Sequence, residues 1–247
     1  MIAEVNYTDL RRFAESGDCN TPSWVSSEIL DLLDEREERM RISLATLMNR
    51  HGTDKLFYHH YEGEYERHFA PLRDQSLSIL EIGVGGFDHP DRGGESLKVW
   101  RDYFPNARVL GIDIAEKTLE LGNRITLRVC DQNDPAQLTE LNEQHGPFDI
   151  VIDDGSHHQQ HIMTSFITLW PLLIPGGIYV IEDMATAYWP DYGGDPQQPP
   201  TIGLIATLIN NMHQRYWRAL RPGEGDPAEV KSVHVSREIA FIYKVKG

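Results

Sequence analysis

The stretch Ser78-Ile-Leu-Glu-Ile-Gly-Val-Gly-Gly86 decides the fold class, because an apolar strand, expected over Ser78–Val84, runs directly into a glycine-rich turn. Glycines at this point let the backbone turn tightly and approach a ligand without interference from a Cβ atom. The turn alone is a weak indication, since it could bind one of several nucleotide-type cofactors or be only a turn. The rest of the chain has to decide between them.

Downstream of this turn, short apolar runs alternate with helical stretches. The expected strands are Ser78–Val84, Arg108–Ile112, Thr126–Cys130, Asp149–Ile152 and Gly177–Ile181, and the expected helices are Ser96–Phe104, Ala136–Gln144, Gln159–Leu173 and Ile202–Leu220. Such alternation predicts a parallel sheet covered on both faces.

Two further strand-like runs, Val230–Val235 and Ile239–Val245, lie close together and indicate a hairpin. We therefore predict an α/β protein with a Rossmann-like class I methyltransferase fold. Its sheet has seven strands, is mostly parallel and ends in an antiparallel hairpin. A dinucleotide dehydrogenase would usually continue in parallel.

The N-terminal part of the chain predicts helices rather than strands. Ser26 or Ser27 can cap a helix, a second is expected over Ile42–Asn49, and the aromatic residues of Tyr58–Phe69 have near-helical spacing. The apolar residues of the first helix are Ile29, Leu30, Leu32 and Leu33. We interpret residues 1–57 as a helical cover segment and residues 58–247 as the methyltransferase domain.

Composition restricts the partners. The 247 residues carry a formal net charge of −15, from 38 acidic and 23 basic side chains. Without a local basic stripe, such a chain repels nucleic acid. No apolar run approaches the roughly 18 residues of a membrane span. Met1–Asp9 lacks the layout of a signal peptide. We expect a cytoplasmic protein that binds neither nucleic acid nor membrane.

Three details of the glycine-rich turn favour S-adenosylmethionine over a dinucleotide. Asp88 stands where the dinucleotide pattern has a third small residue. Glu81 precedes the glycines and could accept a hydrogen bond in the methionine region. The loop continues through Phe87–Glu95, so no helix N-terminus is pressed against a pyrophosphate, and S-adenosylmethionine has none.

Acids also follow the next two strands. Asp113 is the expected partner of the ribose hydroxyls, and Asp131 with Gln132 could read the adenine amino group. Each acid alone could be a helix cap or a strand-end turn. At successive strand ends of one sheet edge they indicate a ligand site. The cofactor-binding residues expected are Glu81, Gly83, Gly85, Asp113, Asp131, Gln132 and Asp153.

Acids and histidines gather after the fourth and fifth strands. The fourth runs into Asp153-Asp154-Gly-Ser-His157-His158 and the fifth into Glu182-Asp183. Carboxylates so close repel one another unless a cation neutralises them, and Mg²⁺ prefers oxygen ligands. We assign Asp154, Glu182 and Asp183 to the metal, whereas Asp153 is expected to point the other way, toward the cofactor. Turn acids and solvated histidines are the alternative interpretation.

Two features complete the predicted site. His157 lies just past the turn, where an imidazole is suited to act as general base near neutral pH. The run Tyr188-Trp-Pro-Asp-Tyr192 predicts an aromatic loop over the site. Aromatic faces bind sugars and planar groups, so Tyr188, Trp189 and Tyr192 are expected to contact the substrate. An ordinary packed loop is the alternative.

These motifs resemble those of the sugar O-methyltransferases of antibiotic biosynthesis, the mycinamicin and macrocin O-methyltransferase type. The resemblance rests on His51-Gly-Thr-Asp-Lys55, Leu80–Gly86, Asp131-Gln-Asn-Asp134, Val151–His157, Val180–Met184 and Tyr188-Trp189-Pro190. It covers most of the chain after about residue 50. It implies S-adenosylmethionine, Mg²⁺, His157 as base, and Asp154, Glu182 and Asp183 as metal ligands.

The resemblance also implies a sugar hydroxyl of a secondary metabolite as acceptor, and a homo-oligomer. A large N-terminal domain helps to build the site in that family, whereas the segment here is short, so the acceptor does not transfer directly. A rhamnose-type deoxysugar on a polyketide is the preferred expectation. A catechol O-methyltransferase, an iron-dependent hydroxylase of the same fold and a non-catalytic cofactor-binding protein are the alternatives.

Overall fold

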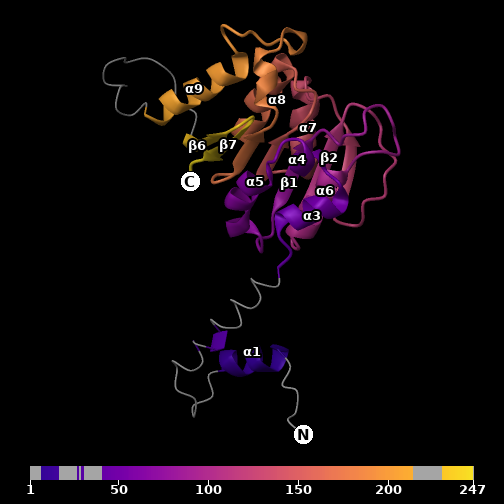
Figure 1. Cartoon of the computed structure of the whole chain (residues 1–247), viewed down its shortest axis with the longest axis vertical. Helices are drawn as coiled ribbons and strands as arrows, with labels where there is room; N and C mark the ends of the chain where they lie inside the picture. Colours follow the sequence, from indigo (N-terminus) through magenta and orange to yellow (C-terminus); the bar gives the residue numbers. More distant parts are fainter. Residues whose placement is uncertain (1–6, 17–26, 28, 31–40, 214–229, 247) are drawn as a thin grey trace. The chain divides into compact units, whose positions relative to one another are not determined.

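The chain forms two compact units, residues 1–43 and 44–247. The computed structural model describes residues 7–16, 27, 29–30, 41–213 and 230–246 (Figure 1). The first unit contains helix α1, Tyr7–Ser16. Of the helix predicted after it, Ser27, Ile29 and Leu30 are helical, whereas Ser26, Leu32 and Leu33 lie outside the described residues.

A seven-stranded sheet forms the centre of the second unit, in the order β3-β2-β1-β4-β5-β7-β6. The strands are β1 Ser78–Ile82, β2 Arg108–Asp113, β3 Ile125–Val129, β4 Ile150–Asp153, β5 Ile178–Ile181, β6 Val230–Ser236 and β7 Ile239–Lys244. The first five are parallel, and β7 is antiparallel to both β5 and β6. The predicted mixed sheet with a terminal hairpin is confirmed.

Helices cover both faces of this sheet (Figure 1). One face carries α3 Leu44–His51, α4 Asp54–Phe57, α5 Glu62–Phe69 and α6 Glu95–Tyr103, and the other carries α7 Pro135–His145, α8 Gln159–Leu172 and α9 Pro200–Met212. Short 3₁₀ turns are η1 Ala70–Leu72, η2 Met184–Tyr188 and η3 Pro190–Tyr192. The unit thus begins with α3, and residues 44–57 belong to it.

Strand alternation distributes the side chains between two apolar cores. In β1, Ile79 packs into the core under α3, α5 and α6, whereas Leu80 and Ile82 pack into the core under α7, α8 and α9. Neighbouring side chains of a strand point to opposite faces. Glu81 is therefore turned toward the first core, where it is fully buried.

The parallel strands end level with one another. Ile82 pairs with Ile112 on one side and Asp153 on the other, and Asp153 pairs with Ile181. The residues that follow these strands consequently meet at one edge of the sheet, where open α/β sheets bind ligands.

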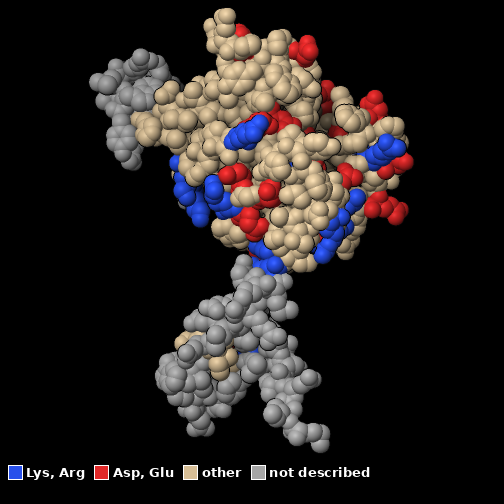
Figure 2. Space-filling model, viewed as in Figure 1, with Lys and Arg blue, Asp and Glu red and all other residues tan. Residues whose placement is uncertain are grey.

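The length of the helices and the distribution of surface charge bear on the expected partners. Among them, no helix is both long and apolar enough for a bilayer crossing. Figure 2 shows acidic and basic side chains interspersed on the face that it draws, and on the described part of that face the basic residues form no continuous stripe.

Candidate functional site

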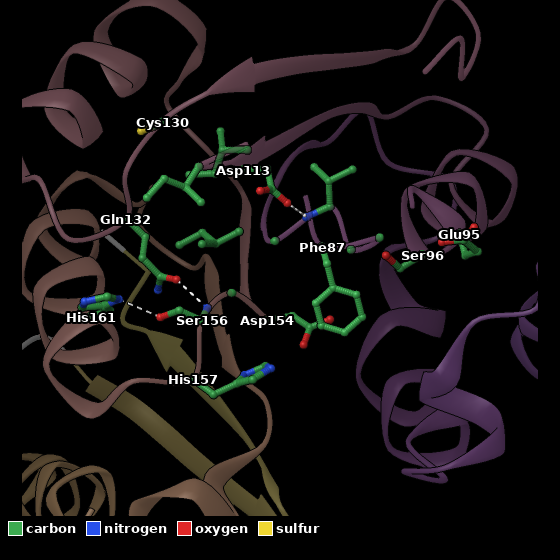
Figure 3. Close-up of a pocket in the computed structure, with 18 of the residues that line it drawn as sticks. Phe87, Glu95, Ser96, Asp113, Cys130, Gln132, Asp154, Ser156, His157 and His161 are labelled. Carbon is green, nitrogen blue, oxygen red and sulfur yellow. Dashed lines mark hydrogen bonds between the residues drawn. The ribbon is translucent and has the colours of Figure 1, made fainter. Parts of the chain in front are cut away.

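A cavity of about 470 Å³ opens at this sheet edge (Figure 3). Its volume lies in the range of small-molecule sites. Of the residues predicted from the sequence to form the site, those that line it are Gly83, Gly85, Asp113, Asp131, Gln132, Asp154 and His157. The cavity therefore joins the predicted cofactor loop to the predicted catalytic cluster.

The two predicted glycines have different surroundings. Both adopt a positive φ, +94° at Gly83 and +78° at Gly85. A Cβ atom on Gly83 would overlap the backbone carbonyl of Asp154, whereas one on Gly85 would meet nothing closer than 3.9 Å. Gly83 thus lets the loops after β1 and β4 approach each other, and Gly85 leaves space.

Asp113 fixes the glycine loop to the end of β2. Its Oδ2 accepts a hydrogen bond of 3.1 Å from the backbone N–H of Val84, and its Oδ1 accepts one of 2.9 Å from that of Ala115. Each carboxylate oxygen has a further lone pair. Asp113 can therefore still accept hydrogen bonds from a ligand in the cavity, and its contact with the ribose hydroxyls stays a prediction.

The Asp153 side chain points to the face of the sheet that α7, α8 and α9 cover, and Asp153 is not among the described residues that line the cavity. Its buried carboxylate accepts hydrogen bonds from Gln132 Nε2 at 3.2 Å, from Tyr179 Oη at 3.0 Å and from Ser165 Oγ. Burial raises the pKa of Asp153 to about 6. Gln132 Oε1 in turn accepts from the Ser156 N–H at 2.7 Å. The buried Asp153 thus fixes the side chain of Gln132, which lines the cavity.

Asp154, His157 and Asp183 converge on one point. One ligand atom from each lies within 4.8 Å of the others, and His157 Nε2 is 3.4 Å from Asp183 Oδ2. His157 and Asp183 have φ values of 59° and 51°, which L side chains rarely adopt. Two predicted metal ligands and the predicted base are thus brought together. The carboxylate oxygens of Asp154 and Asp183 suit a hard divalent cation, and the His157 imidazole lies beside them.

Glu182 lies deeper, beside a buried lysine that the sequence interpretation did not assign to the site. Its Oε1 accepts a hydrogen bond of 2.7 Å from Lys55 Nζ and another from Tyr65 Oη. Lys55 Nζ also donates to Asp154 Oδ2 and lies 3.5 Å from Glu81 Oε1. Burial alone would lower the pKa of Lys55, but the three carboxylates hold it well above its ordinary value.

Glu81 is directed away from the cavity and is not among the described residues that line it. Its Oε2 accepts a hydrogen bond of 2.9 Å from Trp100 Nε1. Burial raises the pKa of Glu81 to about 7, against the opposing effect of Lys55. In this structure the Glu81 carboxylate contacts Trp100 and Lys55 in the protein interior. Its expected contact with a cofactor stays a prediction.

Asp183 has further neighbours from the segment before the sheet. Its Oδ1 accepts from Tyr61 Oη at 3.0 Å and lies 3.1 Å from His59 Nδ1. Together with Glu238, His59 and Asp183 form a second group whose ligand atoms lie within 4.8 Å of one another.

The aromatic run follows β5 as the turns η2 and η3. Tyr188 and Trp189 are exposed, and Tyr192 packs against the rings of Trp189 and His158, with centroids 5.8 and 5.4 Å away. The N–H of Gly194 closes the loop on the carbonyl of Trp189 at 2.9 Å. None of the three aromatic residues is among the described residues that line the cavity. Their contact with a substrate stays a prediction.

Several residues of the site were not predicted individually. Thr53, Asp54 and His161 line the cavity, and Thr53 caps α4, the helix that carries Lys55. The motif His51-Gly-Thr-Asp-Lys55 contains Thr53, Asp54 and Lys55, and its part in the family resemblance is the sequence signal for these residues.

Comparison with known proteins gives the family. A family model described as a methyltransferase domain matches residues 42–184. The chain belongs to this methyltransferase domain family. The predicted fold class and the predicted resemblance are both confirmed.

Relatives with assigned reactions resemble this methyltransferase domain closely. An 8-demethyl-8-α-L-rhamnosyl tetracenomycin-C 2′-O-methyltransferase of Streptomyces olivaceus is 45% identical over 205 residues, covering 81% of this chain and 54% of its own. A demethylmacrocin O-methyltransferase of Streptomyces fradiae is 45% identical over 193 residues, covering 75% and 49%.

Among solved structures, the MycE methyltransferase of the mycinamycin biosynthetic pathway, in complex with Mg, SAH and mycinamycin VI, is 42% identical. The TM-score is 0.74, and the match covers 84% of this chain and 56% of that one. The chain thus spans about half the length of the relatives that it matches.

Proposed function

We propose that this methyltransferase domain catalyses O-methylation of a sugar hydroxyl, with S-adenosylmethionine as methyl donor and a divalent cation, Mg²⁺, in the site. The observation that carries the proposal is the convergence of Asp154, His157 and Asp183, of which Asp154 and His157 line the same cavity as the glycine loop. The relatives named above support it, because one is an O-methyltransferase of a rhamnosyl tetracenomycin, another is a demethylmacrocin O-methyltransferase, and a third was solved with Mg and SAH.

The cavity suits the cofactor. Gly85 leaves open space at the turn, and Asp113, Asp131 and Gln132 line the wall beside it. S-adenosylmethionine, when bound, supplies an electrophilic methyl group on sulfur. We assign Asp113 to the ribose hydroxyls and Asp131 with Gln132 to the adenine, because each stands at the end of a parallel strand.

The cation site also fits its residues. Asp154 and Asp183 offer carboxylate oxygens, and a bound divalent cation would lower the pKa of an acceptor hydroxyl. Glu182 stays a predicted third ligand. Its Oε1 is engaged by Lys55 and Tyr65, so Oε2 is the atom that we expect to face the cation.

His157 is the proposed general base. Its side chain lines the cavity, is 26% exposed, and lies beside Asp183. An imidazole in this place can accept the proton that the acceptor hydroxyl loses as the methyl group is transferred.

The proposed acceptor is a rhamnose-type deoxysugar on a polyketide. The rhamnosyl tetracenomycin that one relative methylates supports a glycoside over a catechol. Tyr188, Trp189 and Tyr192 are the proposed contacts of the acceptor. A homo-oligomer in the cytoplasm that binds neither nucleic acid nor membrane stays a prediction.

The first test is a methyl-transfer assay. Purified protein is incubated with S-adenosylmethionine and a panel of glycosylated polyketides and catechols, with Mg²⁺ or with EDTA. We expect methylated glycosides with Mg²⁺ and none with EDTA. Undiminished turnover in EDTA would remove the metal from the proposal, and methylation of catechols alone would remove the sugar.

The second test concerns the base. His157→Ala should lower methyl transfer by about 10²-fold or more and leave binding of S-adenosylhomocysteine unchanged. His213→Ala, at an exposed histidine after α9, is the control and should retain activity. Full activity of His157→Ala would refute the assigned role.

A further inference from the structure

Lys55 is a cation buried among carboxylates. It comes from α4, before the sheet, and its side chain is 1% exposed. Its Nζ contacts Asp154 Oδ2, lies 2.7 Å from Glu182 Oε1 and lies 3.5 Å from Glu81 Oε1. A buried charge is tolerated only where it is paired and hydrogen-bonded. The three acids and the lysine therefore depend on one another for their places.

The lysine is more deeply buried than the side chains of the candidate cation site. The side chains of Asp154, His157 and Asp183 are 23%, 26% and 18% exposed, and Asp154 and His157 line the cavity. Lys55 approaches from the closed interior. We therefore expect a cation that enters through the cavity to meet Asp154 and His157 without displacing the lysine.

Tyr65 supports the same arrangement. Its hydroxyl donates to Glu182 Oε1, the oxygen that Lys55 also contacts, and its ring is fully buried against Trp100 and Phe241. Glu182 is thus held by two donors from the interior. Groups behind the ligands of a metal site commonly fix their orientation.

We infer that Lys55 is a positioning residue, whose ammonium group holds the carboxylates of Asp154 and Glu182 in the arrangement that receives the divalent cation. This inference rests on the proposed function. It assigns part of the cation site to the helical segment before the sheet, which contributes no ligand of the Asp154, His157 and Asp183 group itself.

Lys244 provides a matched control. It is also buried, and its Nζ donates to the carbonyls of Trp170, Pro171 and Leu173 at 3.0, 3.0 and 2.8 Å. These bonds fasten β7 to the end of α8 and involve no carboxylate of the site. Removing either amine costs stability, but only Lys55 should affect cation binding.

The experiment measures Mn²⁺ binding and thermal unfolding of the full chain. We expect Lys55→Met to weaken Mn²⁺ binding about 10- to 100-fold. Lys244→Met should bind Mn²⁺ like the wild type, although both variants melt at a lower temperature. Mn²⁺ binding by Lys55→Met that equals or exceeds that of the wild type would overturn the inference.

If Lys55→Met does not fold, a second pair of less disruptive variants tests the same inference. Tyr65→Phe removes one donor to Glu182, whereas Tyr103→Phe removes the donor of a 2.8 Å bond to Glu66, outside the site. We expect weaker Mn²⁺ binding in Tyr65→Phe only, by about threefold or more, and equal binding in the two variants would overturn the inference. No saturable Mn²⁺ binding by the wild type would instead overturn the proposed function, and this inference with it.

Discussion

At the scale of single residues, strand alternation determines what each acid of the site can reach. Asp153 and Asp154 are neighbours, yet Asp153 contacts Tyr179 on one face of the sheet and Asp154 contacts Lys55 on the other. The sequence predicted that they would diverge, with Asp153 directed toward the cofactor. Successive side chains of a strand do point to opposite faces, and the cofactor contact of Asp153 stays a prediction. It could not show that Asp153 would be fully buried, because that depends on Ser165 and Tyr179, from distant parts of the chain.

The glycine loop gives a prediction about backbone packing. Gly83→Ala should lower the free energy of unfolding by about 3 kcal/mol or more, because a rigid backbone carbonyl cannot move away from the new Cβ. Gly85→Ala should cost only about 1–2 kcal/mol, from its positive φ. Urea denaturation of both variants measures the difference, and equal losses would contradict the packing assigned to Gly83.

His68 gives a prediction about pH. Burial lowers the pKa of His68 to about 4; its Nδ1 lies 2.8 Å from Tyr243 Oη, and its buried Nε2 has no hydrogen-bond partner among the described residues. The unfolded chain binds the proton more readily, at a pKa near 6.5, so stability should fall as the pH falls from about 6.5 to about 4.

His68→Phe preserves the stack on Phe241, whose centroid is 4.1 Å away, and removes the titration. Between pH 7 and pH 5 the variant should lose about 2 kcal/mol less unfolding free energy than the wild type. His89→Phe, at an exposed histidine, is the control and should follow the wild type in urea denaturation at both pH values. Parallel losses in all three proteins would refute the assignment.

At the scale of elements, hydrophobic periodicity located the strands and helices of the sheet well. The strand predicted over Ser78–Val84 is β1 Ser78–Ile82, and the two runs predicted as a hairpin are β6 and β7. The aromatic residues of Tyr58–Phe69 predicted a helix by their spacing, and α5 Glu62–Phe69 packs against the first core. Tyr61 and Tyr65 reach the site as well, which periodicity could not show because their partners lie more than a hundred residues away.

The loop after the glycines yields a prediction at this scale. Lys117 Nζ donates to the backbone carbonyls of Gly85 at 2.7 Å and His89 at 3.2 Å, and also to that of Phe87. Because Gly85 and Phe87 line the cavity, Lys117→Met should weaken S-adenosylhomocysteine binding about three- to tenfold, measured by calorimetry. Lys231→Met, at an exposed lysine of β6, is the control. Unchanged affinity in Lys117→Met would show that the loop keeps its shape without the lysine.

At the scale of the whole molecule, the domain boundary predicted after residue 57 stays a prediction, and the compact units of the structure divide the chain earlier. We predicted a cover segment through residue 57, whereas the compact unit with the sheet begins at Leu44. Leu44, Leu47 and Met48 are buried in the first core, and Lys55 lies behind the candidate cation site. Length and helical pattern could not separate a detachable helix from one that completes a core, since both have the same apolar spacing.

This boundary can be tested by truncation. Every described residue of the two apolar cores lies at or after Leu44, and a 10-residue helix such as α1 is marginal without tertiary packing. A chain of residues 44–247 should therefore unfold cooperatively, with a midpoint within a few degrees of the full chain, and bind S-adenosylhomocysteine equally well. A chain of residues 58–247 lacks α3 and α4 and should lose cooperative unfolding, because the first core is left open and Glu182 loses Lys55. Circular dichroism melts and calorimetry compare the three chains, and a folded 58–247 chain would restore the boundary predicted from the sequence.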